Sequence, residues 1–332
     1  MLSSNDDSPS PTISLETLSL FIKQQAKLLG FELVGIVPAT YLHEEAEKLQ
    51  TWLDNGYHAG MDWMERYQSL RTNPSELLHQ CQSVVMVGIN YFPGWEAGQG
   101  DEVKVARYAV GKDYHKLIRR RLAKLMKAIQ TVAPHVTGRA FVDSAPLLEK
   151  ALAVRAGLGW QGKHSLLINP KLGSWLFIGE LLITAPLAYD EPLPSNSLSE
   201  SISFCGTCTK CIQACPTDAI VAPTVVDATQ CIAYWTIEAD AGLPLPTAIG
   251  AEQLKGWVFG CDICQEVCPW NVKFSAVTQE SAFLPSVVLT HPNKDFLEGL
   301  SEESFEKTFA GSALRRSGVA KLQQNLSRIE RS

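Results

Sequence analysis

The chain has 332 residues, of which 45% are apolar and 19% are charged, and its formal charge is −6. This composition supplies enough apolar material for two or three folded domains, which excludes disorder of the whole chain. The acidic balance argues against nucleic-acid binding through bulk charge, although it leaves room for a local basic surface.

The chain begins with a polar stretch, residues 1–14, that lacks the basic and apolar segments of an export signal. We therefore predict a disordered lead-in there. The most apolar stretch, residues 175–189, is interrupted by Glu180 and Pro186 and is shorter than the ~20 residues of a membrane helix. We expect a cytoplasmic protein with reduced thiols and no membrane contact.

Helical and extended patterns alternate from about residue 15 to residue 190. Apolar spacing predicts helices over 15–29, 44–55, 113–132 and 146–156, and strands over 31–37, 83–92, 138–142, 165–169 and 175–184. Interleaved elements of this kind favour a layered α/β or α+β domain. A linker rich in Pro, Ser and Glu follows at 190–203. We predict a layered domain over 15–195, a cysteine-rich module over 196–285 and a short helical tail over 286–332.

Eight of the nine cysteines lie in the module, and they form two motifs with one cysteine between them. The first motif matches the run that surrounds a 4Fe–4S cluster in bacterial ferredoxins: Cys205-x2-Cys208-x2-Cys211-x3-Cys215-Pro216. The second motif is one cysteine shorter: Cys261-x2-Cys264-x3-Cys268-Pro269, with Cys231 lying between the motifs.

The spacing divides these cysteines into two sets of four. Three thiolates at x2 spacing surround one cluster, while the cysteine before the proline turns to the neighbouring cluster. The first set is Cys205, Cys208, Cys211 and Cys268. The second set is Cys215, Cys231, Cys261 and Cys264. We therefore predict a ferredoxin-like module with two 4Fe–4S clusters, suited to passing single electrons.

Two other uses of cysteine are less consistent with this pattern. Zinc also binds Cys-x2-Cys pairs, but three cysteines at this spacing followed by x3-Cys-Pro are not typical of zinc sites. A disulfide framework would need an oxidising compartment. The ninth cysteine, Cys81, precedes the strand predicted from Ser83, and we expect a buried, unreactive thiol.

The layered domain contains two further signals. Residues 157–162 read G-x-G-x-x-G, but a helix precedes them and a strand follows, which is the reverse of a dinucleotide site. The glycines fit a close backbone approach or a tight turn. Asp143 ends a predicted strand and precedes a predicted helix, so it is either a helix cap or an acid at a pocket mouth.

Several segments together resemble the epoxyqueuosine reductase family over about residues 15–285: 141–146 (FVDSAP), 155–166 (RAGLGWQGKHSL), 173–181 (GSWLFIGEL) and the cysteine motifs with 227–237 and 260–271. The resemblance implies an α+β protein. Its layered α/β catalytic domain would be nitroreductase-like and similar to cobalamin-processing proteins, and a ferredoxin-like two-cluster module and a short helical tail would follow.

The resemblance also implies a cobalamin-dependent enzyme that removes the epoxide oxygen of epoxyqueuosine at the wobble position of tRNA, the last step of queuosine synthesis. Asp143 would be the general acid beside the corrin. The other residues expected near the cofactor are Arg71, Arg107, His164, Ser165, Leu167 and Asn169. Because an acid must be protonated to act, we expect the corrin and a dry pocket to raise the pKa of Asp143.

A tRNA substrate needs basic and aromatic contacts. Lys116, Arg120, Lys124 and Lys127 share one face of the helix predicted over 113–132, which is either an RNA contact or a solvated surface. Candidates for stacking on anticodon bases are Tyr234, Trp235 and Trp270. The tail from Ser301 to Ser332 offers only one or two helices, with Arg315 and Arg316 as candidate RNA contacts, whereas longer relatives carry helical repeats there. We expect a monomer, with an electron donor that the sequence does not identify.

Two alternatives compete with this interpretation. A reductive dehalogenase also combines cobalamin with two clusters, but it usually carries a twin-arginine signal, and residues 1–14 contain no arginine. An iron–sulfur electron-transfer protein would use the first 190 residues for docking, which leaves Asp143 and the Gly-Lys-His segment at 162–164 unexplained. The epoxide reductase is the favoured hypothesis.

Overall fold

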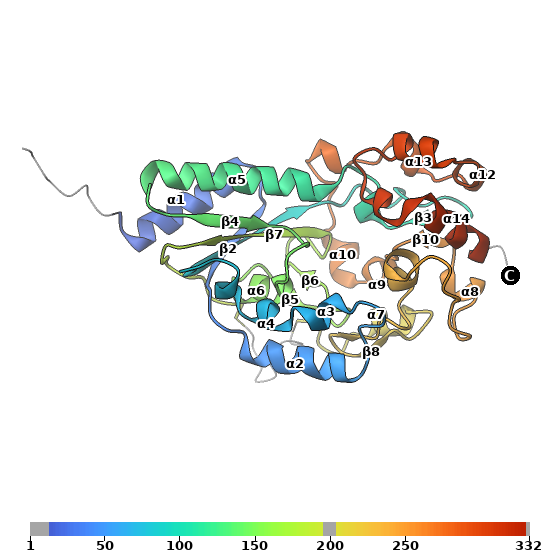
Figure 1. Ribbon diagram of the computed structural model, residues 1–332, viewed down its shortest axis with the longest axis horizontal. Helices are drawn as coiled ribbons and strands as arrows, with labels where there is room; N and C mark the ends of the chain where they lie inside the picture. Colours follow the sequence, from blue (N-terminus) through green and yellow to red (C-terminus); the bar gives the residue numbers. More distant parts are fainter. Residues whose placement is uncertain (1–12, 195–203, 330–332) are drawn as a thin grey trace, which may run out of the picture.

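The computed structural model describes residues 13–194 and 204–329. Its largest sheet has four antiparallel strands in the order β1-β2-β7-β4 (Figure 1). Their bounds are Leu33–Pro38 for β1, Ser83–Asn90 for β2, Leu176–Ile183 for β7 and Gly138–Phe141 for β4. The α+β class and these four strands are confirmed. The predicted lead-in lies almost entirely outside the described residues, as does much of the predicted linker.

Helices cover both faces of this sheet. Helices α1 (Leu15–Leu28) and α5 (Tyr114–Val132) lie on one face, and the shorter α6 (Glu149–Arg155) lies on the other (Figure 1). Strand side chains alternate between faces. Phe177, Leu181 and Ile183 therefore join the core under α1 and α5, whereas Leu176, Ile178 and Leu182 join the core under α6.

Short elements complete the α6 side of the sheet. They are α2 (His43–Asp54), α3 (Trp63–Arg66), α4 (Gln68–Thr72) and η1 (Pro74–Glu76), with the hairpin of β5 (Trp160–Gln161) and β6 (Leu167–Ile168). A Cβ on Gly159 would lie 2.2 Å from the carbonyl oxygen of Ile168. This glycine therefore serves the close backbone approach of the hairpin, as the sequence indicated.

Helix α6 begins later than predicted. Its first residue is Glu149 and its N-cap position is Leu148, so the interpretation of Asp143 as the helix cap was wrong. The segment before α6 is a turn in which Asp143 has a φ of +57°, a left-handed conformation that few non-glycine residues adopt. This turn separates Asp143 from the helix.

The cysteine-rich region consists of helices and strands of at most six residues. They are α7 (Lys210–Ala214), β8 (Ile220–Ala222), β9 (Val225–Val226), η3 (Tyr234–Glu238), α8 (Ala251–Leu254), β10 (Trp257–Phe259), α9 (Ile263–Glu266) and α10 (Pro269–Phe274). Strand β10 pairs in parallel with β3 (Lys104–Val105), which precedes η2 (Arg107–Ala109). The cysteine-rich region is therefore joined to the first half by backbone hydrogen bonds.

The tail is helical and packs on both halves (Figure 1). Its elements are η4 (Ser281–Phe283), α11 (Val287–Thr290), α12 (Lys294–Glu298), α13 (Glu302–Thr308), η5 (Ala313–Ser317) and α14 (Gly318–Ile329). Phe305 and Leu322 of the tail share one core with Val105 and Val258. Among the described helices, none is long and apolar enough to cross a membrane.

Candidate active site and iron–sulfur ligands

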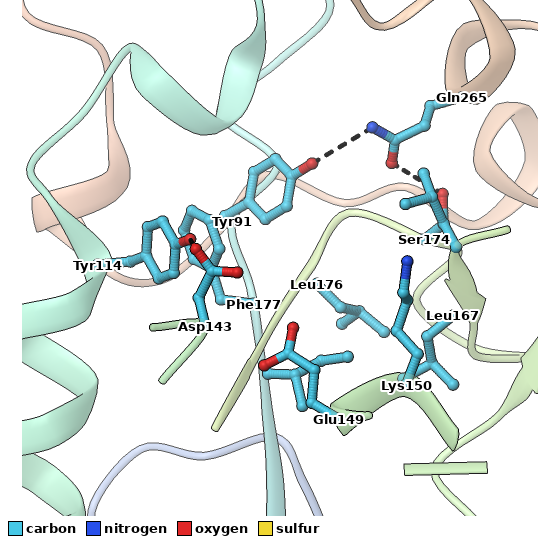
Figure 2. Close-up of a pocket in the computed structure, with 12 residues that line it drawn as sticks. Tyr91, Tyr114, Asp143, Glu149, Lys150, Leu167, Ser174, Leu176, Phe177 and Gln265 are labelled. Atoms are coloured by element: carbon cyan, nitrogen blue, oxygen red, sulfur yellow. Dashed lines mark hydrogen bonds between the residues drawn. The ribbon is translucent and has the colours of Figure 1, made fainter. Parts of the chain in front are cut away.

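A cavity of about 250 Å³ opens at the start of strand β7 (Figure 2). It continues into a second space of about 510 Å³ that reaches the tail at Arg315 and Arg316. The two spaces share seven of their lining residues: Tyr91, Tyr114, Asp143, Leu166, Leu176, Phe177 and Gln265. The walls therefore combine aromatic and apolar side chains with several charged and polar groups, which are more numerous in the outer space.

Asp143 presents its carboxylate to this cavity from the turn after β4. Tyr114 Oη donates a hydrogen bond of 2.9 Å to Asp143 Oδ2 (Figure 2). His115 Nε2 lies 3.3 Å from the same oxygen. Both partners come from the first turn of α5, where the Asp113 side chain caps the helix and contacts His115 Nδ1 at 2.7 Å. The N-terminus of α5 therefore fixes the position of the acid.

The pKa of Asp143 is lowered, which contradicts the expectation from the sequence. Burial in the cavity acts to raise it, but the hydrogen bonds from His115 and Tyr114 outweigh burial. The side chain also remains 47% exposed, which limits the cost of its charge. The hydrogen bond to Asp143 in turn raises the pKa of His115. Asp143 and His115 thus form a pair in which the imidazole holds the proton.

Two further ionisable residues line the smaller cavity, both from the start of α6. Burial, with the nearby charge of Asp143, raises the pKa of Glu149 to about 7, while burial lowers the pKa of Lys150 (Figure 2). Glu180 of β7 is 1% exposed, and burial, together with Glu149 and Asp143, raises its pKa well above the ordinary value. Glu149 and Glu180 therefore lie in a poorly hydrated region that favours their protonated forms.

The opposite wall of the cavity comes from the cysteine-rich region. Gln265 of α9 accepts a hydrogen bond of 3.0 Å from Ser174 Oγ and lies 3.5 Å from Tyr91 Oη (Figure 2). Asn271 of α10 accepts from the Ser174 backbone at 2.6 Å and donates to Ser174 Oγ at 2.9 Å. Since Gln265 lies between Cys264 and Cys268, the cysteine motif itself helps to enclose the cavity.

Of the predicted cofactor contacts, some line this cavity and others have structural partners elsewhere. Asp143 and Leu167 line it. Arg107 is 2% exposed and pairs with Asp262 at 3.2 Å and with Glu266 at 2.5 Å, which favours a structural role. Asn169 donates to the Leu158 carbonyl oxygen at 2.7 Å and so stabilises the loop before β5.

The remaining predicted contacts have unused hydrogen-bonding atoms or strained backbone. Buried His164 Nε2 and buried Arg71 Nε have no partner among the described residues. Burial lowers the pKa of His164 to about 4, so its imidazole is neutral near pH 7. Ser165 has a φ of +67° and accepts from Gln161 Nε2 at 3.1 Å. His164 and Arg71 therefore each keep an unused donor, but neither residue lines the cavity.

The predicted cluster ligands influence one another both within and between the two predicted sets. Burial, together with Cys205, Cys268 and Cys208, raises the pKa of Cys211 to about 11. Burial also raises the pKa of Cys264, with Cys231, Asp262, Cys211 and Cys215 acting in the same direction. The last member, Cys261, is influenced by Cys264 and Cys231. Crowded thiols can all ionise only when positive charge lies among them, so iron fits both groups.

Two further findings concern the cysteines. In residues 13–194 and 204–329, no three His, Cys, Asp or Glu side chains are arranged to hold a single metal ion. Cys81 is 9% exposed, and burial raises the pKa of its thiol to about 11, as expected of an unreactive cysteine.

The expected RNA contacts differ in exposure. Lys116, Arg120, Lys124 and Lys127 are exposed on α5. The candidates for base stacking are less accessible. Tyr234 is buried, with its hydroxyl accepting from the Gly60 backbone at 2.9 Å, so it is not available for stacking. Trp235 and Trp270 are partly buried, and Trp270 packs against Trp160.

Sequence analysis did not identify Tyr114, His115, Glu149, Lys150 and Gln265 as site residues. The N-cap signal of Asp113 could have drawn attention to Tyr114 and His115, since the start of a long helix presents its first side chains at a sheet edge. Gln265 has no comparable signal beyond its position between two ligand cysteines.

The fold and the site together define an iron–sulfur oxidoreductase, in which an acid-bearing cavity adjoins a region with eight clustered cysteines. Comparison with known proteins narrows this class. The family model "Epoxyqueuosine reductase QueG, DUF1730" matches residues 71–144, and the model "4Fe-4S double cluster binding domain" matches residues 204–271. An epoxyqueuosine reductase of Cyclobacterium marinum is 42% identical over 318 residues, covering 94% of this chain and 97% of the relative.

Solved structures agree with this assignment. A crystal structure of epoxyqueuosine reductase with an epoxyqueuosine-modified tRNA-Tyr stem loop is 26% identical, with a TM-score of 0.79, and covers 93% of this chain and 79% of that chain. A Bacillus subtilis epoxyqueuosine reductase, described with its aspartate catalytic loop swung out of the active site, has a TM-score of 0.82 at 26% identity, with the same coverage. The chain belongs to the epoxyqueuosine reductase family.

Proposed function

We propose that this protein reduces epoxyqueuosine to queuosine at the wobble position of tRNA, with Asp143 as the proton donor and cobalamin in the cavity beside it. One observation carries the proposal. The Asp143 carboxylate enters a cavity whose opposite wall is Gln265, a residue between two predicted cluster ligands. The acid and the electron-carrying region therefore meet at one site. The relative bound to a modified tRNA stem loop supports the substrate.

The cavity has the chemistry that a corrin needs. Apolar side chains, among them Leu166, Leu167 and Leu176, would contact its macrocycle, while Lys150, Ser174 and Gln265 offer polar groups for its amides. His164 and Arg71 do not line the cavity and stay predicted contacts. When bound, cobalamin supplies a reducing cobalt at the substrate ring, and two 4Fe–4S clusters supply it with single electrons. Arg107, Ser165 and Asn169 stay predicted contacts, for which the geometry offers a supporting role around the cavity.

Proton delivery falls to Asp143 and His115. Removal of the epoxide oxygen as water takes two electrons and two protons. Since the pKa of Asp143 is lowered and that of His115 is raised, the resting pair keeps its proton on the imidazole. Passage of that proton through Asp143 to the leaving oxygen would regenerate the carboxylate, and solvent at the half-exposed side chain would reload the pair.

The tRNA would approach over the start of α5 and the tail. Lys116, Arg315 and Arg316 line the outer space of the cavity. Phosphate groups could replace Glu306 as the partner of Arg315 and Glu238 as the partner of Arg316. The exposed lysines and Arg120 along α5 would extend this basic surface.

The remaining parts of the proposal follow the sequence. The first cluster would use Cys205, Cys208, Cys211 and Cys268, and the second would use Cys215, Cys231, Cys261 and Cys264. The domain division at 15–195, 196–285 and 286–332, a monomeric state and a cytoplasmic location also stay predictions. The electron donor is open.

Anaerobic turnover of epoxyqueuosine-containing tRNA tests the proposal. Reconstituted protein would be assayed with a strong reductant, with and without cobalamin, alongside Asp143→Ala and the surface control Asp54→Asn. We expect cobalamin-dependent queuosine from wild type and from Asp54→Asn, and a loss on the order of 10²–10⁴-fold for Asp143→Ala. Full activity of Asp143→Ala would overturn the assignment of Asp143 as the proton donor. Absence of product from protein loaded with both cofactors would overturn the assignment of epoxyqueuosine-containing tRNA as the substrate.

A further inference from the structure

A buried lysine lies against the loop of the first cysteine motif. Lys163 is 7% exposed and belongs to the turn between β5 and β6. Its Nζ donates a hydrogen bond of 2.8 Å to the carbonyl oxygen of Gly206, which lies between Cys205 and Cys208. A side chain of the catalytic half thus brings an ammonium group to the backbone that would surround a cluster.

The position of this lysine is fixed from both sides. Its own carbonyl oxygen accepts from the Thr224 backbone at 3.0 Å, which ties the turn to the β8–β9 hairpin of the cysteine-rich region. The neighbouring Trp160 packs with Cys268 and, through its ring, against Phe204 at 4.7 Å between centroids. The ammonium group therefore cannot move away from the first motif without a rearrangement of this contact.

No Asp or Glu of the described residues forms an ion pair with Lys163. The second group of cysteines has a different charge environment. There Arg107 is paired with two carboxylates, Asp262 and Glu266, of which Asp262 lies between Cys261 and Cys264. One cysteine group thus faces a cation without an ion-pair partner among the described residues, whereas the other faces a cation that two carboxylates more than offset.

We propose that Lys163 raises the reduction potential of the cluster bound by Cys205, Cys208, Cys211 and Cys268. This inference rests on the ligand sets given under the proposed function. A cluster with four thiolate ligands gains one negative charge on reduction, so a fixed cation nearby stabilises the reduced form. The low exposure of Lys163 reduces solvent screening and strengthens the effect. The two clusters would therefore differ in potential because of their surroundings.

An EPR-monitored redox titration of the reconstituted holoenzyme tests this role, and it needs neither tRNA nor turnover. Lys163→Gln keeps a donor for the Gly206 carbonyl oxygen and removes the charge, whereas Lys163→Arg keeps the charge. The matched control is Lys210→Gln, which removes an exposed lysine next to Cys211. Iron content is measured for every sample.

We expect Lys163→Gln to move one of the two midpoint potentials to a more negative value. The expected shift corresponds to about a tenfold smaller equilibrium constant for reduction of that cluster, or 59 mV for one electron. The other midpoint potential of Lys163→Gln should stay near the wild-type value. Both potentials of Lys163→Arg and of Lys210→Gln should also stay near wild type. Equal shifts in Lys163→Gln and Lys163→Arg, or no shift with full iron content, would overturn the proposal.

A second variant covers the case in which Lys163→Gln loses iron. Lys163→His is neutral at pH 8, since burial holds the pKa of an imidazole at this position below its ordinary value, as it does for the adjacent His164. We expect the potential of the first cluster in Lys163→His at pH 8 to lie below that of wild type by about as much as in Lys163→Gln. An unchanged potential with full iron content would also overturn the proposal. Because these readings concern the cluster alone, they stay separate from success or failure of the tRNA reaction.

Discussion

The sheet half and the cysteine-rich region hold their shapes in different ways. In the first, β2 and β7 are buried along their whole length between helices of up to 19 residues. In the second, the longest helix, α10, has six residues, and the strands have two or three. Helices this short are not stable by themselves in water. The first half therefore folds around a hydrophobic core, while the second needs its metal ligands.

This difference assigns a separate task to each region. A core-packed sheet keeps Asp143, Tyr114 and His115 at fixed distances, which an acid catalyst requires. A region held together by clusters can surround them closely with backbone and thiolates. Gln265 and Asn271 join the two, because both contact Ser174 at the base of the cavity. Loss of iron should thus damage one wall of the cavity and leave the other intact.

The largest expected effect is that of iron removal. Anaerobic chelation should abolish amide-exchange protection in the cysteine motifs at 205–216 and 261–269, while β2, β7 and the core-packed β10 stay protected, because only the motifs depend on metal ligands. Hydrogen exchange measured by mass spectrometry checks this. Reconstitution with iron and sulfide is the control and should restore protection. Simultaneous loss of protection in β2 and β7 would show a single cooperative unit instead.

The next effect concerns the hydrophobic core under α5. Ile118 is fully buried against Gly179 of β7, and Ile118→Ala should lower the free energy of unfolding by about 2–5 kcal/mol. Chemical denaturation followed by far-UV circular dichroism measures the change. Iron content of the folded variant should equal that of wild type. Leu20→Ala, at a side chain that is 58% exposed, is the control and should change stability by less than about 0.5 kcal/mol.

Asn271→Ala should have a smaller effect at the junction of the two regions. The side chain is fully buried, and its removal leaves the Ser174 backbone and the Gln265 carbonyl oxygen without this partner. We expect a loss of about 1–3 kcal/mol in thermal unfolding. Exposed Asn55→Ala is the control. A loss no greater than that of the control would mean that the junction is held by the strand pairing of β3 and β10.

The smallest effect is the pH dependence of the Asp143–His115 pair. The raised pKa of His115 contributes stability that is present below its unfolded value of about 6.5 and is lost as the pH rises through its folded value. The lowered pKa of Asp143 contributes stability above its unfolded value that is lost as the pH falls through its folded value. The Tm of His115→Gln should therefore lie below that of wild type, and the difference between the two should shrink toward both high and low pH. A Tm difference that is constant with pH would contradict the interaction of Asp143 with His115.

The two regions also differed in how much their sequences revealed. Most of the predicted cysteine ligands lie within short motifs whose spacing reflects the size of a cluster, so the sequence alone predicts two sets of four, and this division stays a prediction. The strands of the sheet were predicted from apolar runs, but not their order, because the pairing of β2 with β7 joins residues far apart in the chain.

Errors arose where distant side chains act on a local motif. The pKa of Asp143 was predicted to rise through the corrin and a dry pocket, since an acid must be protonated to act. The hydrogen bonds that lower it come from Tyr114 and His115, which lie 29 and 28 positions earlier. The cap role of Asp143 failed for a related reason, since the left-handed turn before Glu149 is fixed by tertiary contacts and not by helix signals.

Anomalous scattering from crystals of the cobalamin-loaded protein would test the central claim most directly. Data at the cobalt and iron edges would locate both metals without reference to activity. We predict one cobalt peak inside the cavity lined by Asp143, Leu176 and Gln265, and two groups of iron atoms, one within each set of four cysteines. Cobalt bound outside this cavity, or a different division of the cysteines between the iron groups, would contradict the proposed active site.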